Sequence, residues 1–204
     1  MRTLSALLLA TGICAAPYPA LAADIAAEVR ARLAESPVVR GTFEQRKTVV
    51  GFSKPLASSG DFLVWRGHGV LWQTRKPFDA QLVLTRDRLV ARSADTTYQI
   101  NAGTEPALRV TNQLLFAVLA GDVESLQQHF RVTGELDGKD AWRVALVPTD
   151  AGLARFLRRV EIDGDRYVRH VRIDETNGDS SAIRFEALSD APPPTPEEVK
   201  RLAE

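Results

Sequence analysis

Short hydrophobic runs separated by turn residues dominate the chain, and they predict a mainly β structure. In the first half the runs have the length and alternation of strands, and Gly67-His68-Gly69 and Thr85-Arg86-Asp87 provide tight turns. The pattern resumes after residue 130, where Gly164 and Gly178 mark turns. The predicted strands are Val38–Val50, Leu56–Ser59, Asp61–Arg66, Val70–Arg75, Ala80–Thr85, Arg88–Ser93, Thr96–Ile100, Arg131–Leu136, Ala141–Val147, Arg158–Asp163, Val168–Asp174 and Ala182–Leu188.

Helical patterns interrupt the strands. Apolar residues four apart predict a helix over Asp24–Glu35, and Leu114–Ala120 is a helical segment that is apolar on every side. Asp122 is placed to cap a second short helix that runs through Gln128, and the extended segment Pro192–Pro196 precedes a short charged helix. The order of elements predicts an α+β, mainly β fold, with an unclosed antiparallel β-barrel or strongly curved sheet.

Both faces of one predicted hairpin are apolar. Phe62 and Val64 share one face of their strand, while Leu63 and Trp65 occupy the other. We expect the first helix to cover one of these faces, and the helix Leu114–Ala120 to pack on sheet with one side and on a ligand or second element with the other. Arg66 falls on the face of Phe62 and Val64, where a guanidinium needs hydrogen-bond partners or must reach solvent at the strand end.

Composition narrows the class of protein without naming a function. The 204 residues contain 26 Lys and Arg against 26 Asp and Glu, so the formal net charge is zero. This balance argues against a nucleic-acid-binding protein, which usually has a basic surplus. About 45% of the residues are hydrophobic, which is typical of a globular domain.

The first 22 residues have the pattern of a cleaved secretory signal. A basic start at Arg2 precedes an apolar stretch from Leu4 to Ala16, and Ala20-Leu21-Ala22 fits a signal-peptidase site. The single cysteine, Cys14, lies in this segment, so we expect the mature chain to have no disulfide and no cysteine-based metal site. The expected organisation is a signal peptide over 1–22, one domain over 23–190 and a proline-rich tail over 191–204.

Signals for catalysis are weak. His68, His129 and His170 have no metal-ligand spacing, and Gly51-Phe52-Ser53-Lys54-Pro55 lacks the second glycine of a nucleophile elbow. No glycine-rich phosphate loop is present, and Asp163-Gly164-Asp165 lacks the rest of a calcium loop. We therefore expect a protein that is not an enzyme and that uses no metal or cofactor.

A set of short motifs carries a family resemblance. Phe43-Glu44-Gln45 is followed 17 residues after Phe43 by Gly60-Asp61, and then by Arg66, Trp72 and Pro77. In order and spacing these residues resemble the outer-membrane lipoprotein carrier protein (LolA) family. The similarity continues through Leu114-Leu115 to Gly121-Asp122, Trp142 to Pro148, Asp174, Gly178 and Phe185, and it covers roughly Asp24 to Leu188.

The sequence also departs from the family pattern. Gly67 stands where the family usually has a proline after the arginine, and Arg86-Asp87 stands where it has an Asp-Gly turn. A proline-rich tail replaces the family's C-terminal strand segment. These differences indicate a divergent branch, in which the fold carries over better than the cargo.

The resemblance implies a helical lid over an apolar cavity, and a periplasmic protein that carries acylated cargo. It implies that Arg66 hydrogen-bonds the lid in the empty, closed state and acts as a lid latch. For the residues expected to line the cavity, ordinary packing in the core is the competing interpretation. They are Leu33, Phe43, Phe62, Val64, Trp72, Leu114, Leu115, Val118 and Leu119.

Three functions remain open at this stage. The first is a monomeric carrier that takes lipoproteins from an inner-membrane transporter to an outer-membrane acceptor. The second has the same cavity but carries another lipid, such as an acylated or polyene product that works with an exporter. The third is a lipoprotein-sensing regulatory module, which usually has a further interaction domain.

Overall fold

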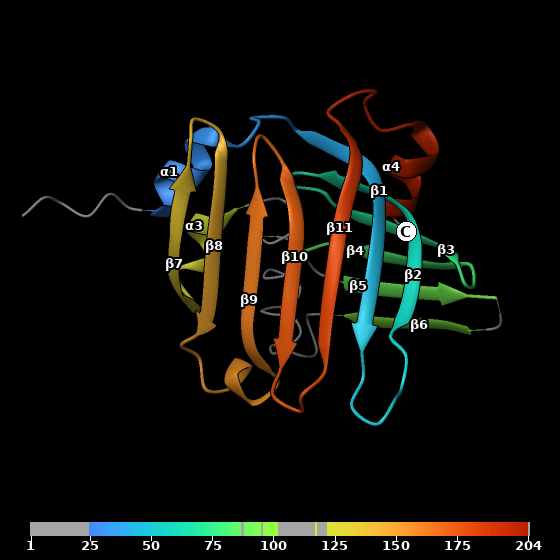
Figure 1. The fold of residues 1–204 in the computed structure, drawn as a ribbon. Coiled ribbons are helices and arrows are strands. Elements are labelled where there is room, and N and C mark those ends of the chain that lie inside the picture. The colour runs from blue at the N-terminus through green and yellow to red at the C-terminus, as the bar shows by residue number, and fades with distance from the viewer. Residues whose placement is uncertain (1–24, 87, 95, 102–116, 118–121, 204) are drawn as a thin grey trace, which may run out of the picture.

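One antiparallel sheet forms most of the molecule. The computed structural model describes residues 25–86, 88–94, 96–101, 117 and 122–203, so the expected signal peptide lies outside the described residues. The 11 strands are ordered β6-β5-β4-β3-β2-β1-β11-β10-β9-β8-β7 (Figure 1). The elements are α1 (Ile25–Arg32), β1 (Val38–Thr48), β2 (Leu56–Trp65), β3 (Gly69–Lys76), β4 (Ala80–Leu84), β5 (Arg88–Ser93), β6 (Thr96–Asn101), α3 (Val123–Leu126), β7 (Phe130–Asp137), β8 (Ala141–Pro148), the 3₁₀ helix η1 (Leu153–Arg155), β9 (Leu157–Gly164), β10 (Val168–Glu175), β11 (Ser180–Ser189) and α4 (Pro196–Ala203).

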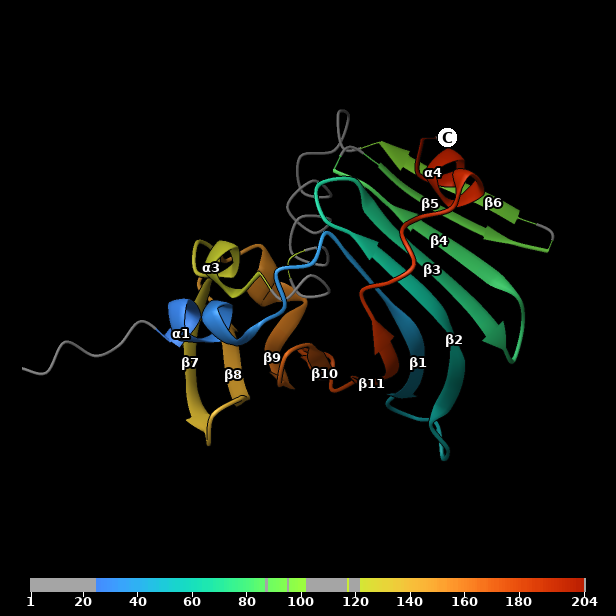
Figure 2. The same cartoon turned by 90° about the horizontal axis from the view of Figure 1, so that it is seen from above.

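The sheet is strongly curved and does not close. Strands β6 and β7 are the two ends of the strand order, and no pairing joins them among the described strands. Figure 2 shows the sheet bending around the side on which α1 and α3 lie. The predicted fold class, a mainly β protein with an unclosed antiparallel barrel or curved sheet, is confirmed.

Strand β2 is longer than the sequence pattern predicts. The hydrophobic pattern predicts two strands separated at Gly60, because glycine commonly marks a turn, but the structure has one strand from Leu56 to Trp65. The register against β3 shifts between Ser59 and Gly60, and a Cβ at position 60 would lie 1.9 Å from the carbonyl oxygen of Gln73. Glycine is needed here for a close approach of two backbones within a continuous strand.

Helix α1 does not cover the β2–β3 hairpin as expected. Its main contacts are with α3, β7 and β8, at the other end of the sheet. Helix α3 begins as predicted: the backbone N–H of Ser125 donates to the Asp122 carboxylate at 3.1 Å. None of the helices in the described ranges has the length and hydrophobicity that a membrane-spanning helix requires.

Helix α4 covers one face of β2–β4. Leu202 is buried against Leu63, Leu71 and Val83, together with Val38 and Val90, and this group is separate from the main core. Arg88 also donates to the carbonyl oxygen of Leu202 at 2.8 Å. The C-terminal segment thus covers one of the two apolar faces of the hairpin.

A capping box and an ion pair fix the start of α4. The N–H of Thr195 donates to the Glu198 carboxylate at 2.8 Å, and the N–H of Glu198 donates back to the Thr195 hydroxyl at 3.2 Å. Arg40 of β1 donates to both Glu198 carboxylate oxygens, each at 3.2 Å. Burial raises the pKa of Glu198, but the Thr195 and Arg40 contacts outweigh it and hold this pKa below its ordinary value of 4.5.

Replacement of Leu202 tests the docking of α4. We expect Leu202→Ala to lower the free energy of unfolding by about 2 kcal/mol, because it leaves a cavity against Leu63 and Leu71. Val199→Ala, on the exposed side of the same helix, should change it by less than about 0.5 kcal/mol. Urea unfolding followed by fluorescence measures both, and equal small effects would contradict the docking.

Candidate functional site

Four aromatic side chains from adjacent strands gather on the face of the sheet opposite α4. The register pairs Phe43 of β1 with Phe185 of β11, and Phe62 of β2 with Trp72 of β3. The rings of Phe43 and Trp72 are stacked with centroids 3.8 Å apart, and the ring of Phe62 meets that of Phe185 edge-on at 5.0 Å. We call these four residues the aromatic cluster.

A small apolar pocket adjoins the aromatic cluster. Its walls include Phe62 and Phe185 together with aliphatic side chains from the residue after α1, from β1 and from the ends of β10 and β11. The free volume is about 20 Å³, roughly the room that one water molecule needs. The lining consists of Leu33, Val39, Phe62, Arg66, Arg166, Tyr167, Val168, Phe185 and Leu188.

Basic and aromatic groups form part of the pocket lining. Arg66 is anchored through its backbone N–H, which donates to the carbonyl oxygen of Pro37 at 2.8 Å. Arg166 pairs with Asp190 at 2.9 Å, and the guanidinium carbons of Arg166 and Arg169 lie 5.6 and 5.9 Å from the ring centroid of Tyr167. Cations therefore edge an otherwise apolar pocket.

The turn that carries Arg166 and Tyr167 is held rigidly. Trp142 donates its indole N–H to the carbonyl oxygen of Asp165 at 2.7 Å. The Asp165 carboxylate accepts from Arg169 at 3.1 Å and from the N–H of Tyr167 at 3.0 Å. Burial raises the pKa of Asp165, but the Arg169 and Tyr167 hydrogen bonds outweigh it and keep this pKa below its ordinary value of 3.8.

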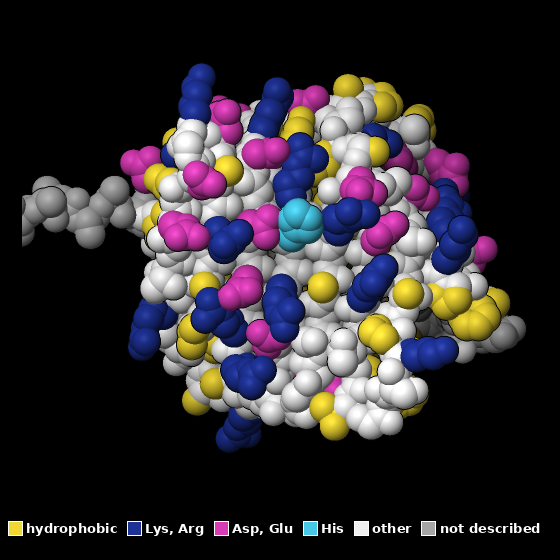
Figure 3. Space-filling model, in the orientation of Figure 1, with side chains coloured by type: hydrophobic (Ala, Val, Ile, Leu, Met, Phe, Trp, Pro, Cys, Tyr) yellow, Lys and Arg dark blue, Asp and Glu magenta, His cyan; other side chains and the backbone are white. Residues whose placement is uncertain are grey.

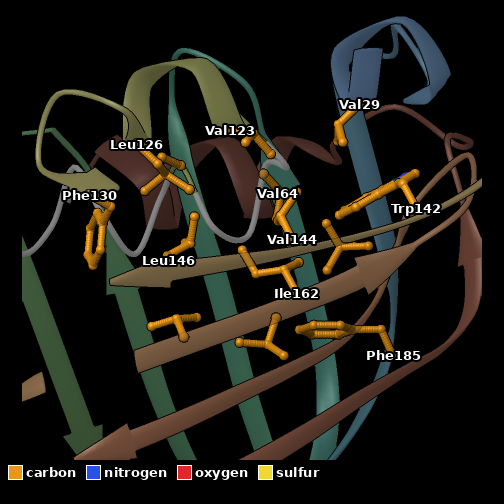
Figure 4. Close-up of a cluster of buried hydrophobic side chains, with 14 of the residues drawn as sticks. Val29, Val64, Val123, Leu126, Phe130, Trp142, Val144, Leu146, Ile162 and Phe185 are labelled. Carbon is orange, nitrogen blue, oxygen red and sulfur yellow. The ribbon is translucent and has the colours of Figure 1, made fainter. Parts of the chain in front are cut away.

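The described side chains on much of the concave face form packed core. Val29 of α1 and Leu126 of α3 are completely buried, as are Val144 and Leu146 of β8 and Ile162 of β9. Figure 4 shows these side chains gathered between the helices and the sheet, with Phe185 on the same side. The site is therefore a pocket at one margin of a continuous hydrophobic core.

The structure brings only some of the predicted site residues to the pocket. Leu33, Phe62 and Arg66 line it together, although they come from different elements. Phe43 and Val64 are fully buried in the core beside it, and Trp72 is partly buried on Phe43. Leu114, Leu115, Val118 and Leu119, with the expected lid helix, lie outside the described residues.

Several lining residues were absent from the predicted set. Phe185 has a clear signal, since it alternates with the exposed Arg184 and Glu186 along β11. Arg166 and Tyr167 have no comparable signal, because they occupy a β9–β10 turn whose sequence resembles an exposed loop.

The chemistry of the pocket suits binding of an apolar chain. The described residues that line it offer no carboxylate, imidazole or thiol, and Tyr167 is their one hydroxyl group. No group of three or more His, Cys, Asp or Glu side chains in the described ranges is arranged to hold a metal ion. An apolar wall with arginines at its edge can shelter a hydrocarbon chain and attract a polar or anionic end group.

Comparison with known proteins identifies one family model. The model described as "Outer membrane lipoprotein carrier protein LolA" matches residues 35–200. A search of curated proteins finds no significant match to this chain.

Solved structures that match this chain have very different sequences. A LolA superfamily protein from Nitrosomonas europaea is 7% identical, with a TM-score of 0.47, and the match covers 83% of this chain and 93% of that one. A DUF1329 family protein from Desulfovibrio piger is 11% identical, with a TM-score of 0.48, and the match covers 81% and 90% of the two chains. The family match, rather than either structure, carries the comparison.

Truncation of Phe43 separates core packing from cargo contact. Phe43 is 1% exposed and stacked on Trp72, so we expect Phe43→Ala to lower the free energy of unfolding by about 3–4 kcal/mol in the absence of any ligand. Phe78→Ala is the matched control, because Phe78 is 81% exposed, and its effect should stay within about 0.5 kcal/mol. Denaturant unfolding measures both values, and a small effect for Phe43 would show that the ring is not required for packing.

Proposed function

The chain belongs to the outer-membrane lipoprotein carrier protein (LolA) family, and we propose that it carries the acyl chains of lipoproteins through the periplasm. Members of this family are carrier proteins. In this proposal an inner-membrane transporter supplies the cargo, an outer-membrane acceptor receives it, and residues 1–22 direct export. The protein works by binding and release, without catalysis.

The observation that carries the proposal is the apolar pocket beside the aromatic cluster. Each acyl CH₂ group kept from water is worth about 0.8 kcal/mol, so a lipoprotein cannot cross an aqueous compartment at a useful rate unless its chains are sheltered. Phe62, Phe185 and Leu188 provide such a surface, and Arg66 and Arg166 are placed at its edge to meet the polar part of the cargo.

The size of the pocket sets a condition on this mechanism. A free volume of about 20 Å³ is many times too small for a long acyl chain. In the proposed mechanism cargo enlarges this pocket as it enters, and the work of enlargement offsets part of the hydrophobic gain. A carrier needs this reduction in binding free energy, because cargo that is bound too tightly is not released.

A second candidate, a carrier of another acylated or polyene lipid, is favoured by the turn that follows Arg66. Gly67 has a φ of +79°, a conformation that proline cannot adopt because its ring fixes φ near −65°. The turn is thus built differently from the Arg-Pro turn that the family resemblance leads one to expect. A different link between this arginine and its surroundings is a specific reason to consider different cargo.

Mass spectrometry of organic extracts from the protein, purified from its native periplasm, tests the proposal. We expect triacylated lipopeptides; another acylated or polyene species would favour the second candidate. No ligand, together with no binding of an apolar fluorescent probe, would contradict both.

Leu188→Glu should lower the amount of extracted ligand several-fold, because it places a charge in the pocket, whereas Leu136→Glu, outside the pocket, should not.

Arg66→Leu tests the proposed latch. If Arg66 favours the closed, empty state, its loss should slow release of bound lipopeptide to acceptor vesicles by roughly tenfold, the worth of one charged hydrogen bond. Arg75→Leu is the matched control, since Arg75 forms a largely exposed ion pair with Asp61. Both variants should unfold cooperatively, and an unchanged transfer rate for Arg66→Leu would exclude the latch.

A further inference from the structure

Three neighbouring loops form one rim of the sheet. They connect β1 to β2, β8 to β9 and β10 to β11, and they lie along the lower edge of the molecule in Figure 1. The N–H of Val50 donates to the Asp179 carboxylate at 2.9 Å, and the N–H of Thr176 donates to the carbonyl oxygen of Phe156 at 3.1 Å. The Thr176 hydroxyl also donates to the carbonyl oxygen of Arg155 at 2.7 Å. The loops are therefore tied into one unit.

Large apolar side chains project from this unit into solvent. Phe156 is 75% exposed and Phe52 is 63% exposed, and Val50 and Leu56 beside Phe52 are also more than half exposed. Single exposed hydrophobic residues are ordinary on protein surfaces. Four of them lie on the connected loops or next to them, and groups of exposed apolar side chains mark contacts with proteins or membranes.

The acidic groups of the rim are held in contacts within the protein. The acidic groups are already engaged: Glu175 pairs with Lys47 at 3.0 Å, and Asp179 is buried and accepts from Val50. Asp150 accepts from the N–H groups of Gly152 and Leu153.

The basic side chains of the rim are exposed. They are Lys54, Arg155 and Arg158, and no ion pair with another described residue engages any of them. Figure 3 shows hydrophobic and basic side chains together along the lower edge of this face.

We propose that this rim, formed by Val50, Phe52, Lys54, Leu56, Arg155, Phe156 and Arg158, contacts the surface of an anionic phospholipid bilayer. Aromatic and aliphatic tips enter the boundary between head groups and acyl chains, and neighbouring cations attract lipid phosphates. Both features occur here on the same connected loops. A purely apolar protein partner would leave the three cations without a role.

The rim lies at the far end of β2 from the pocket. Leu56 begins β2 at the rim, while Arg66 follows its last residue and lines the pocket. A strand of 10 residues spans about 33 Å when straight, so the rim and Arg66 lie at opposite ends of β2. The contact does not require cargo, and its test is independent of the carrier function.

Co-sedimentation with vesicles of phosphatidylethanolamine and phosphatidylglycerol tests this proposal. We expect the full chain, stripped of ligand, to bind these vesicles, to bind phosphatidylcholine vesicles at least tenfold more weakly, and to lose affinity as salt rises. The double variant Phe52→Ser/Phe156→Ser and the double variant Lys54→Glu/Arg155→Glu should each lower binding at least tenfold.

Matched controls come from outside the rim. Leu136→Ser removes an exposed apolar side chain near the end of β7, and Lys139→Glu reverses a charge in the β7–β8 turn, both at the opposite end of β8 from the rim. Both should bind like the unmodified protein. Absence of vesicle binding, or equal losses in rim and control variants, would overturn the proposal, and neither outcome bears on the extracted cargo.

Discussion

The hairpin of β2 and β3 is apolar on both faces, and this constraint organises the molecule. Leu63 and Leu71 face one way, while Phe62 and Trp72 face the other. A sheet with only one covered face would leave one of these pairs in water. The protein covers one face with α4 and builds the aromatic cluster and the pocket on the other. The site is a consequence of how the second face is covered.

The hydrophobic pattern of the sequence predicted those parts of the fold that short segments specify. Alternation along each run identified the strands, the two faces of the hairpin and the start of α3. It divided β2 at Gly60, because sequence alone does not distinguish a glycine that makes a turn from one that admits a neighbouring backbone. The docking of α4 was equally hidden, since Leu202 has its partners more than 100 residues away along the chain.

The contrast between short segments and long-range contacts also explains which pocket residues could be predicted. Phe62 and Arg66 could be predicted because Arg66 directly follows the strand of Phe62 and continues its alternation. Their neighbours Phe185 and Leu188 reach them through the pairing of β1 with β11, which joins the beginning of the domain to its end. Pairing at such a separation depends on the whole sheet, so no short segment of sequence specifies it. Residues in turns, such as Tyr167, follow from the strands that place them.

Because no pairing joins β6 and β7 among the described strands, the sheet does not have the fixed diameter of a closed barrel. In a closed barrel, strand number and shear set the diameter, and widening the interior breaks hydrogen bonds between strands. An open sheet widens by bending, while each strand keeps its neighbours. The volume that this sheet encloses therefore depends on how strongly the sheet is bent, and not on a diameter fixed by strand number and shear.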